Sequence, residues 1–351
     1  MKVVETNDES ASSSKSKTKA ATEFHYYPQL PAEVKLRIWK YVFEFWSLGA
    51  HRFRLRVDPA NPARLILQPT GDQKEDASAW RERHAFARVD EHSFDHFRKL
   101  RSHAATLYRD TKKRRRVKVE ENGICALVDL ETDLILFRFN YGTSQSSLSL
   151  LSVRETSGVF TGITRIAVET EFMFRGFKGT QKFLPFTCIC LDLDTQPKSY
   201  CVVQMVRFLR FFKNLKEFYI VYPITKTSIH EPMLREAVPD KLPELTCTKP
   251  GVSQAALNVF RYLQEIAQVK ELKEFHDRVG IYIEVLREDT IGLFKLPVWY
   301  SLTEIRTKWR EIMGNQPGRE DLQFKVLAWA DLRGATVSGE EQPLRTSGRW
   351  Y

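Results

Sequence analysis

The chain has 351 residues, with 54 Lys/Arg against 44 Asp/Glu and a formal net charge of +10. A hydrophobic content of 42%, including 23 Phe, 12 Tyr and 7 Trp, supports a folded core and excludes a largely disordered chain. No stretch approaches about 18 consecutive uncharged apolar residues, and the N-terminus lacks an apolar signal segment, so we expect no membrane association and no secretion. Five cysteines without framework spacing favour a reducing compartment. We therefore expect an intracellular protein, cytoplasmic and/or nuclear.

The composition predicts four regions along the chain. Residues 1–22 are rich in Ser, Lys, Thr and Ala and are expected to form a disordered tail. Residues 23–140 form a first domain, and residues 141–332 form a mixed α/β region packed on it. Residues 333–351 are expected to be a loose C-terminal tail.

The first predicted helix begins at Pro31, because a proline lacks the N–H that is unpaired in a first helical turn anyway. Apolar residues then occupy an arc of roughly 220° around this helix, about twice what a surface helix needs. Such an arc predicts burial on two sides. Two interpretations follow: both sides contact the protein's own core, or one side is a docking face for another chain.

The same segment resembles the opening of the two-EXR family, which is found mainly in fungi. The shared pattern is Leu-Pro-x-Glu-x-x-x-x-Ile-Trp, carried here by Leu30, Pro31, Glu33, Ile38 and Trp39. It is also similar to the start of an F-box, the helical module that joins substrate receptors to ubiquitin-ligase adaptors. The resemblance implies a protein partner, in particular such an adaptor, bound through these five residues. It carries no catalytic residues.

The resemblance extends to about residue 140 and departs from the family pattern in two places. The first Glu-x-Arg element is Glu33-Val34-Lys35, with lysine in place of arginine. The second corresponds at best to residues 89–94. A third family element, an Asp-x-x-x-x-Phe strand, is matched within residues 129–137.

The first half of the chain alternates between strand and helix patterns. Strict alternation over residues 51–57 predicts a half-buried strand, and residues 64–67 read as its hairpin partner across a Pro-containing turn. Residues 80–109 have helical spacing and predict one long helix, with Val89 in its core stripe. Two strands are expected near residues 124–128 and 134–139.

The second half suggests a parallel crossover. Residues 163–168 and 187–193 are strand candidates, residues 200–212 have helical spacing, and residues 215–222 return as a strand. The remaining expected elements are two helices, 255–269 and 302–313, and two strands, 281–285 and 324–329.

Most of the net charge lies in one segment. Between Arg81 and Lys118 there are 13 Lys/Arg against 5 Asp/Glu, a net of +8. The peak is a run of five basic residues, Lys112, Lys113, Arg114, Arg115 and Arg116. Such a run is typical of a nuclear import signal, a nucleic-acid patch or a solvated loop. We rank nucleic-acid binding last, because no aromatic residues are interleaved for base stacking.

Motifs for catalysis or metal binding are weak. His92, His96 and His103 fall on one side of the expected long helix, but no cysteine pair or His-Glu-x-x-His element completes a metal site. Asp192 and Asp194 have the Asp-x-Asp spacing of some phosphatases, but Gln196 stands where the motif needs Thr or Val. We therefore expect no metal, no cofactor and no catalytic residues.

These observations lead to an α+β fold, with a helical F-box-like N-terminal module packed on antiparallel strands and followed by a mixed α/β half. The expected function is non-enzymatic protein–protein interaction of unassigned role, and an F-box-like adaptor is the form that the resemblance implies. The first alternative is a nuclear protein that binds nucleic acid through residues 112–116, with affinity that falls steeply with salt. The second is an enzyme of unrecognised type, which would need a pocket with converging polar groups.

Overall fold

The computed structural model describes the two halves of the chain with gaps. In the first half, the described residues are 27–44, 48–58, 60–69, 77–81, 89, 91–94, 116–118, 125–137, 155–156 and 160–169. In the second half they are 202–225, 227–230, 245–247, 253–295, 297–314, 321–332 and 335–337. The expected tail 1–22 and the strand candidate 187–193 lie outside these residues.

Strands dominate the described part of the first half. Its elements are η1 (Tyr27–Gln29), α1 (Ala32–Glu44), β1 (Ala50–Asp58), β2 (Asn61–Pro69), β3 (Arg116–Lys118), β4 (Cys125–Leu127), β5 (Leu134–Phe137), β6 (Glu155–Thr156), η3 (Phe160–Gly162) and β7 (Arg165–Glu169). The second half contributes α5 (Val202–Leu209), β8 (Glu217–Pro223), β9 (Leu245–Cys247), α7 (Gln254–Val269), β10 (Glu274–His276), β11 (Gly280–Val285), α8 (Arg287–Thr290), α9 (Val298–Met313), β12 (Gln323–Asp331) and β13 (Ala335–Val337).

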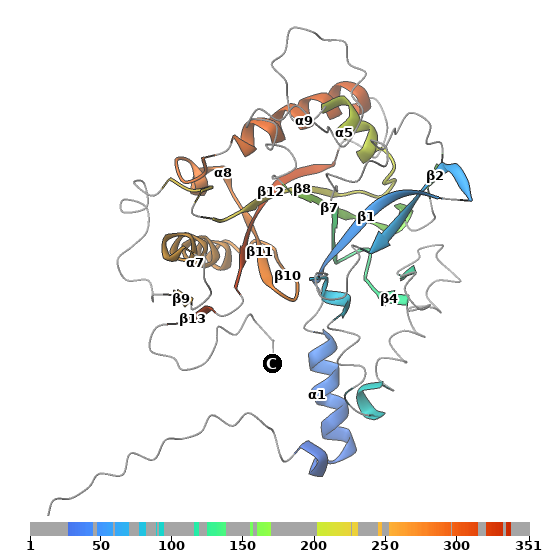
Figure 1. Cartoon of the computed structure of the whole chain (residues 1–351), viewed down its shortest axis with the longest axis vertical. Helices are drawn as coiled ribbons and strands as arrows, with labels where there is room; N and C mark the ends of the chain where they lie inside the picture. The colour runs from blue at the N-terminus through green and yellow to red at the C-terminus, as the bar shows by residue number, and fades with distance from the viewer. Residues whose placement is uncertain are drawn as a thin grey trace, which may run out of the picture.

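A nine-stranded sheet organises the molecule, in the order β10-β11-β12-β8-β7-β5-β1-β2-β6 (Figure 1). Its centre is parallel, because β12, β8, β7, β5 and β1 run in the same direction. Antiparallel strands flank this centre, β11 beside β12 and β2 beside β1. Of the predicted crossover, the helix α5 before β8 and the parallel pairing of β8 with β7 are confirmed, and residues 170–201 lie outside the described residues. The predicted β1–β2 hairpin is also confirmed.

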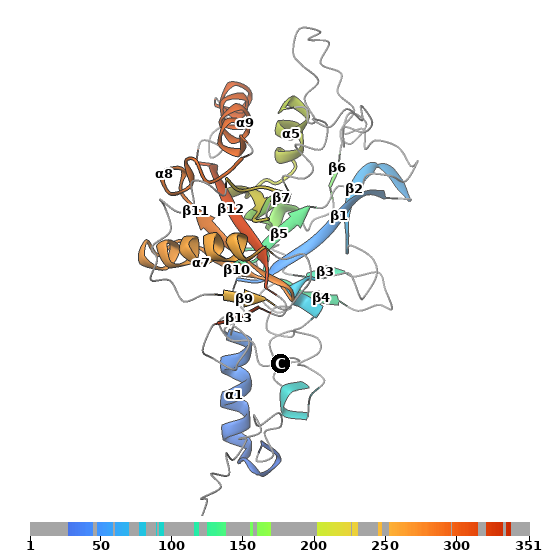
Figure 2. The ribbon, with the colours of Figure 1, turned by 60° about the vertical axis from the view of Figure 1, so that its left-hand side comes forward.

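Helices cover one face of the sheet, which we call the outer face. The buried stripes of α5, α7 and α9 pack there against alternate strand residues such as Phe53, Ile166 and Val326. The α5 and α9 helices lie together over one part of this face and α7 over another (Figures 1 and 2). Phe208 of α5 meets Phe137 of β5 edge to face, with ring centroids 5.1 Å apart.

The opposite face, the inner face, is buried although none of the described helices packs on it. The sheet curls so that β10, at one end of the strand order, meets the start of β1. Gly49 bridges His276, and the His276 N–H donates to the Leu48 carbonyl oxygen at 3.0 Å. We call these three residues the seam. Tyr219 of β8 reaches Phe275 of β10 across the enclosed space, with ring centroids 5.7 Å apart. Seven strands, β10 round to β1, thus enclose the inner face.

This architecture corrects the expected α+β class to mixed α/β. The first half was expected to hold antiparallel strands, but β1 pairs with β5 in parallel and both enter the parallel centre. One sheet therefore continues across residue 140. The expected packing of the N-terminal helix on strands is not seen for the described residues: α1 extends away from the sheet in both views (Figures 1 and 2).

Two further expectations are wrong. Residues 79–81 and 91–94 are helical, but Val89 lies in a bend between them and is 57% exposed, so residues 80–109 are not one helix with Val89 in its core stripe. Residues 335–337, expected in a loose tail, form β13, which pairs with β9.

The end of α7 carries a backbone strain that a mutation should relieve. The Leu272 N–H donates to Ala267 at 2.8 Å and the Glu271 N–H to Gln268 at 3.3 Å, the two bonds of a Schellman motif. Glu271 adopts φ 53° there, a position that favours glycine. We expect Glu271→Gly to raise the free energy of unfolding by about 0.5–1 kcal/mol. Urea denaturation checks this, with Gln268→Gly inside the helix as a control of opposite sign.

Candidate functional site

Two polar clusters lie on the inner face, one towards each end of the parallel strands. Between them the enclosed space is filled by buried side chains, namely Ala50, Leu134, Leu136, Ala167, Val221, Phe275 and Leu327. Polar groups enter this layer where the apolar runs of the strands begin and end. These clusters are therefore the first places to look for chemistry.

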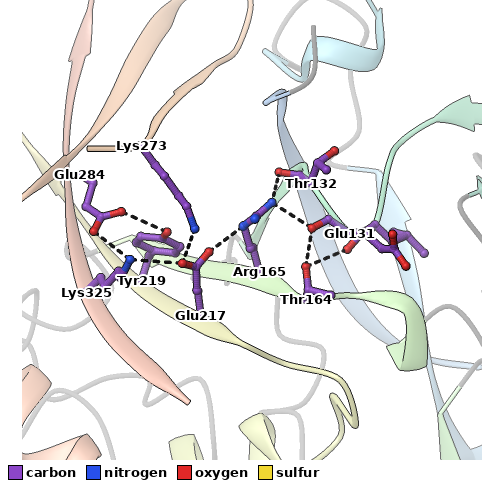
Figure 3. Close-up of polar contacts among 10 residues, drawn as sticks. Glu131, Thr132, Thr164, Arg165, Glu217, Tyr219, Lys273, Glu284 and Lys325 are labelled. Carbon is purple, nitrogen blue, oxygen red and sulfur yellow. Dashed lines mark hydrogen bonds and ion pairs between the residues drawn. The ribbon is translucent and has the colours of Figure 1, made fainter. Parts of the chain in front are cut away.

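The Glu217 cluster lies at the amino ends of β7, β8 and β12 and comprises Arg165, Glu217, Tyr219, Lys273, Glu284 and Lys325 (Figure 3). Arg165 Nε donates to Glu217 Oε2 at 2.6 Å, and Lys273 pairs with Glu217 Oε1. Lys325 Nζ lies between the two carboxylates, 3.2 Å from Glu217 and 2.9 Å from Glu284. Residues far apart in sequence are thus joined through one buried glutamate.

Arg165 extends this cluster to the turn before β5. Its Nη1 donates to the carbonyl oxygens of Glu131 at 2.9 Å and Thr132 at 2.6 Å. Thr164 Oγ1 donates to the Glu131 carbonyl oxygen at 2.7 Å (Figure 3). The arginine therefore links the buried carboxylate of β8 to a backbone turn two strands away.

The charges of the Glu217 cluster stabilise the ionised forms of Glu217 and Lys325. Burial alone would raise the pKa of Glu217, but hydrogen bonds from Lys273 and Arg165 and the charge of Lys325 lower it from 4.5 to about 2. Burial, with the nearby charges of Glu284 and Glu217, raises the pKa of Tyr219. Burial would lower the pKa of Lys325, yet its bond to Glu284 raises it. These shifts move the groups away from neutral pH, whereas a general acid or base works best close to it.

The Arg52 cluster lies towards the other end and joins β1 to the β10–β11 turn. Arg52 Nη2 donates to Tyr282 Oη at 3.0 Å and lies 3.3 Å from Asp277 Oδ2, while the guanidinium stacks 5.7 Å from the Trp329 ring. Tyr282 Oη donates to Asp277 at 2.8 Å. Burial would lower the pKa of Arg52, but Tyr282 and Asp277 raise it. The arginine stays charged and holds the curled sheet closed.

A third polar centre, Asp133, ties down the start of β1. Its Oδ1 accepts the Gly49 N–H at 2.8 Å, and its Oδ2 accepts the Asp129 N–H at 2.8 Å and lies 2.9 Å from His51 Nε2. The His51 and Asp133 side chains are both fully buried. This centre lies next to the seam, so it fixes the strand that closes the sheet.

The residues that the sequence singled out lie elsewhere, on and before α1. Pro31 and Glu33 are exposed, Leu30 and Ile38 are half-buried, and Trp39 lies in α1 with a side chain outside the described set. Lys35 donates to the Pro28 carbonyl oxygen at 2.9 Å. Its ammonium also lies 5.5 Å from the centre of the Tyr27 ring. This lysine fastens the η1 turn to the helix.

The other singled-out residues are described only in part. Within the basic run, Arg116 begins β3 opposite Leu127, and residues 112–115 lie outside the described residues. Of the three aligned histidines, His92 is half-buried and the other two lie outside, as does the Asp-x-Asp pair. The described residues contain no group of His, Cys, Asp or Glu arranged to hold a metal ion. Nor do they include a helix with the length and apolar character that a membrane crossing requires.

Sequence reasoning missed all three polar centres. A usable signal existed, because Arg165 and Glu217 each stand at the first position of an apolar strand run. Comparison of the chain with protein-family models, with curated proteins and with solved structures returned no match.

Proposed function

We propose that this chain is a non-enzymatic interaction protein that binds a protein partner through the segment from Leu30 to Trp39. The supporting observation is the exposure of this segment. None of the described side chains from residue 30 to residue 38 is buried, and Val34, at the centre of the apolar face, is 40% exposed. Val34 belongs to the apolar arc that the sequence predicts, and an exposed apolar side chain there offers area for a partner.

The partner we propose is a ubiquitin-ligase adaptor of the kind that binds F-box helices. The Leu-Pro-x-Glu start and the two-EXR-like pattern support this choice. The mode of binding is helix in groove, with apolar residues such as Ile38 supplying the contact. Trp39 is the residue of this segment whose type is most enriched among interface residues that dominate affinity.

Binding to a purified adaptor tests the proposal. We expect the wild type to bind and the Pro31→Ala, Ile38→Ala, Trp39→Ala variant to bind at least about thirtyfold more weakly, since truncating an anchor residue costs about 2 kcal/mol or more. The matched control is Val269→Ala with Ile291→Ala, which removes exposed apolar groups from another surface. Circular dichroism and thermal unfolding must show that both variants stay folded.

Two binding results would contradict the proposal. If the wild type binds no adaptor, the F-box-like assignment is wrong. If the folded triple variant binds as tightly as the wild type, the contact surface lies elsewhere. The nucleic-acid alternative through residues 112–116 stays a prediction from sequence, and binding that weakens steeply with salt would distinguish it.

A further inference from the structure

The segment 77–81 crosses the seam as a strap. On one side, the Arg52 N–H donates to Ser78 Oγ at 2.8 Å and the Trp80 N–H donates to His51 Nδ1 at 3.2 Å, both contacts with β1. On the other side, the Arg278 N–H of the β10–β11 turn donates to the Ala77 carbonyl oxygen at 2.8 Å. The strap therefore bridges β1 and the β10–β11 turn, the two segments that the seam brings together. Ala77, Ser78 and Trp80 are buried.

The His51 ring can make its two contacts in only one protonation state. A backbone N–H is always a donor, so Nδ1 must act as the acceptor for Trp80 and carry no proton. The proton of the neutral ring then lies on Nε2, where it donates to Asp133 Oδ2. A second proton would go to Nδ1 and would face the Trp80 N–H, donor against donor. The buried amide would lose its acceptor.

We propose that His51, Asp133 and the Trp80 amide form an acid-sensitive latch that holds the strap across the seam. At neutral pH the ring is uncharged and the strap is fastened to β1. When the ring takes up a second proton, the Trp80 amide is released and the strap loosens from β1. The seam between β1 and β10 is still held by its backbone contacts, but the strap no longer spans it.

Other charged groups lie around the latch, and the test must exclude their contribution. Asp133 faces the ring from the turn before β5, and Arg81 stacks 4.5 Å from the Trp80 ring. Arg52 follows His51 on β1 but reaches the inner face and Asp277. At the seam there is a second imidazole, His276, whose Nε2 lies 3.0 Å from Glu274 Oε1. A test must separate His51 from His276.

Amide hydrogen exchange of the full chain provides this test. We compare about pH 7.5 with about pH 5.5, which bracket the ordinary imidazole pKa near 6.5, after correction for the chemical exchange rate. We expect exchange in peptides covering 77–81 to rise about tenfold relative to β8 in the wild type, the change that loss of one buried hydrogen bond produces. The same rise should occur in His276→Gln. It should be absent from His51→Gln, since glutamine offers a donor and an acceptor but takes up no proton.

Two results would overturn the latch: no acid-dependent rise in the wild type, or an equal rise in His51→Gln. If that variant does not fold, ring-nitrogen spectra of the wild type decide the matter. One of the eight histidines should then be the Nε2–H tautomer at neutral pH and should gain its second proton at the midpoint of strap exchange. A strap midpoint in the carboxylate range, or one matched by no histidine, contradicts the proposal.

Discussion

Asp133→Ala is expected to lower the free energy of unfolding by about 3–5 kcal/mol, a large part of the stability of an ordinary domain. The carboxylate accepts hydrogen bonds from the Gly49 N–H, the Asp129 N–H and His51 Nε2. Truncation would leave these donors without that acceptor. Each buried donor left without a hydrogen bond lowers the free energy of unfolding by about 1–3 kcal/mol. Their costs overlap, because the three bonds share one carboxylate. Urea denaturation measures the loss, with the same dependence of the unfolding free energy on urea concentration used for both proteins.

Two companion variants sharpen this expectation. Asp133→Asn keeps the volume and one acceptor oxygen, so its loss should lie between those of the wild type and the alanine variant. Thr132→Ala alters the neighbouring residue, whose carbonyl oxygen rather than side chain contacts Arg165, and should cost less than about 0.5–1 kcal/mol. An alanine variant at Asp133 within about 1 kcal/mol of the wild type would show that this aspartate does not hold β1 in place.

Local patterns predicted the local elements well. The alternation in residues 51–57 gave β1, and the Pro-containing turn placed β2 against it. The crossover was visible because the helical spacing of α5 directly precedes the apolar run of β8. The first helix was placed by Pro31, which precedes α1 directly. In each case the signal and the structure involve the same short stretch of residues.

Strand direction and closure of the sheet could not be predicted in this way. Alternation shows that β1 is half-buried but does not tell which strand it joins, so its parallel pairing with β5 was missed. The seam joins residue 49 to residue 276, two positions that no periodicity connects. The continuous apolar run of β8 did carry a hint, since strands buried on both faces read that way.

The candidate site shows the same limit. Val34 fits a core pattern as well as a docking pattern, and the sequence could not decide which face the chain would cover. The Glu217 cluster collects residues from positions 165, 217, 273, 284 and 325, which only the curled sheet brings together (Figure 3). Charged residues at strand ends were visible beforehand, but their mutual pairing depends on non-local contacts.

Glu217→Gln is the second large expected effect, a loss of about 2–3 kcal/mol at neutral pH. A pKa lowered from 4.5 to about 2 corresponds to roughly 3 kcal/mol of stabilisation, and solvent near the partly exposed Lys273 and Lys325 reduces it somewhat. Glutamine keeps the shape but leaves Arg165, Lys273 and Lys325 without the negative charge that they share. Urea denaturation at neutral pH measures the difference.

The pH dependence of that difference identifies its cause. Because the pKa of Glu217 is lower in the folded chain, its stabilisation is present above about pH 4.5 and is lost as the pH falls towards 2. The stability gap between wild type and Glu217→Gln should therefore be constant above about pH 5 and narrow progressively below it. Glu311→Gln, in the exposed Lys308–Glu311 pair, should cost less than about 0.5 kcal/mol. If the difference in free energy of unfolding between the wild type and Glu217→Gln stays the same down to about pH 3, then packing, not charge, accounts for the stabilisation by Glu217.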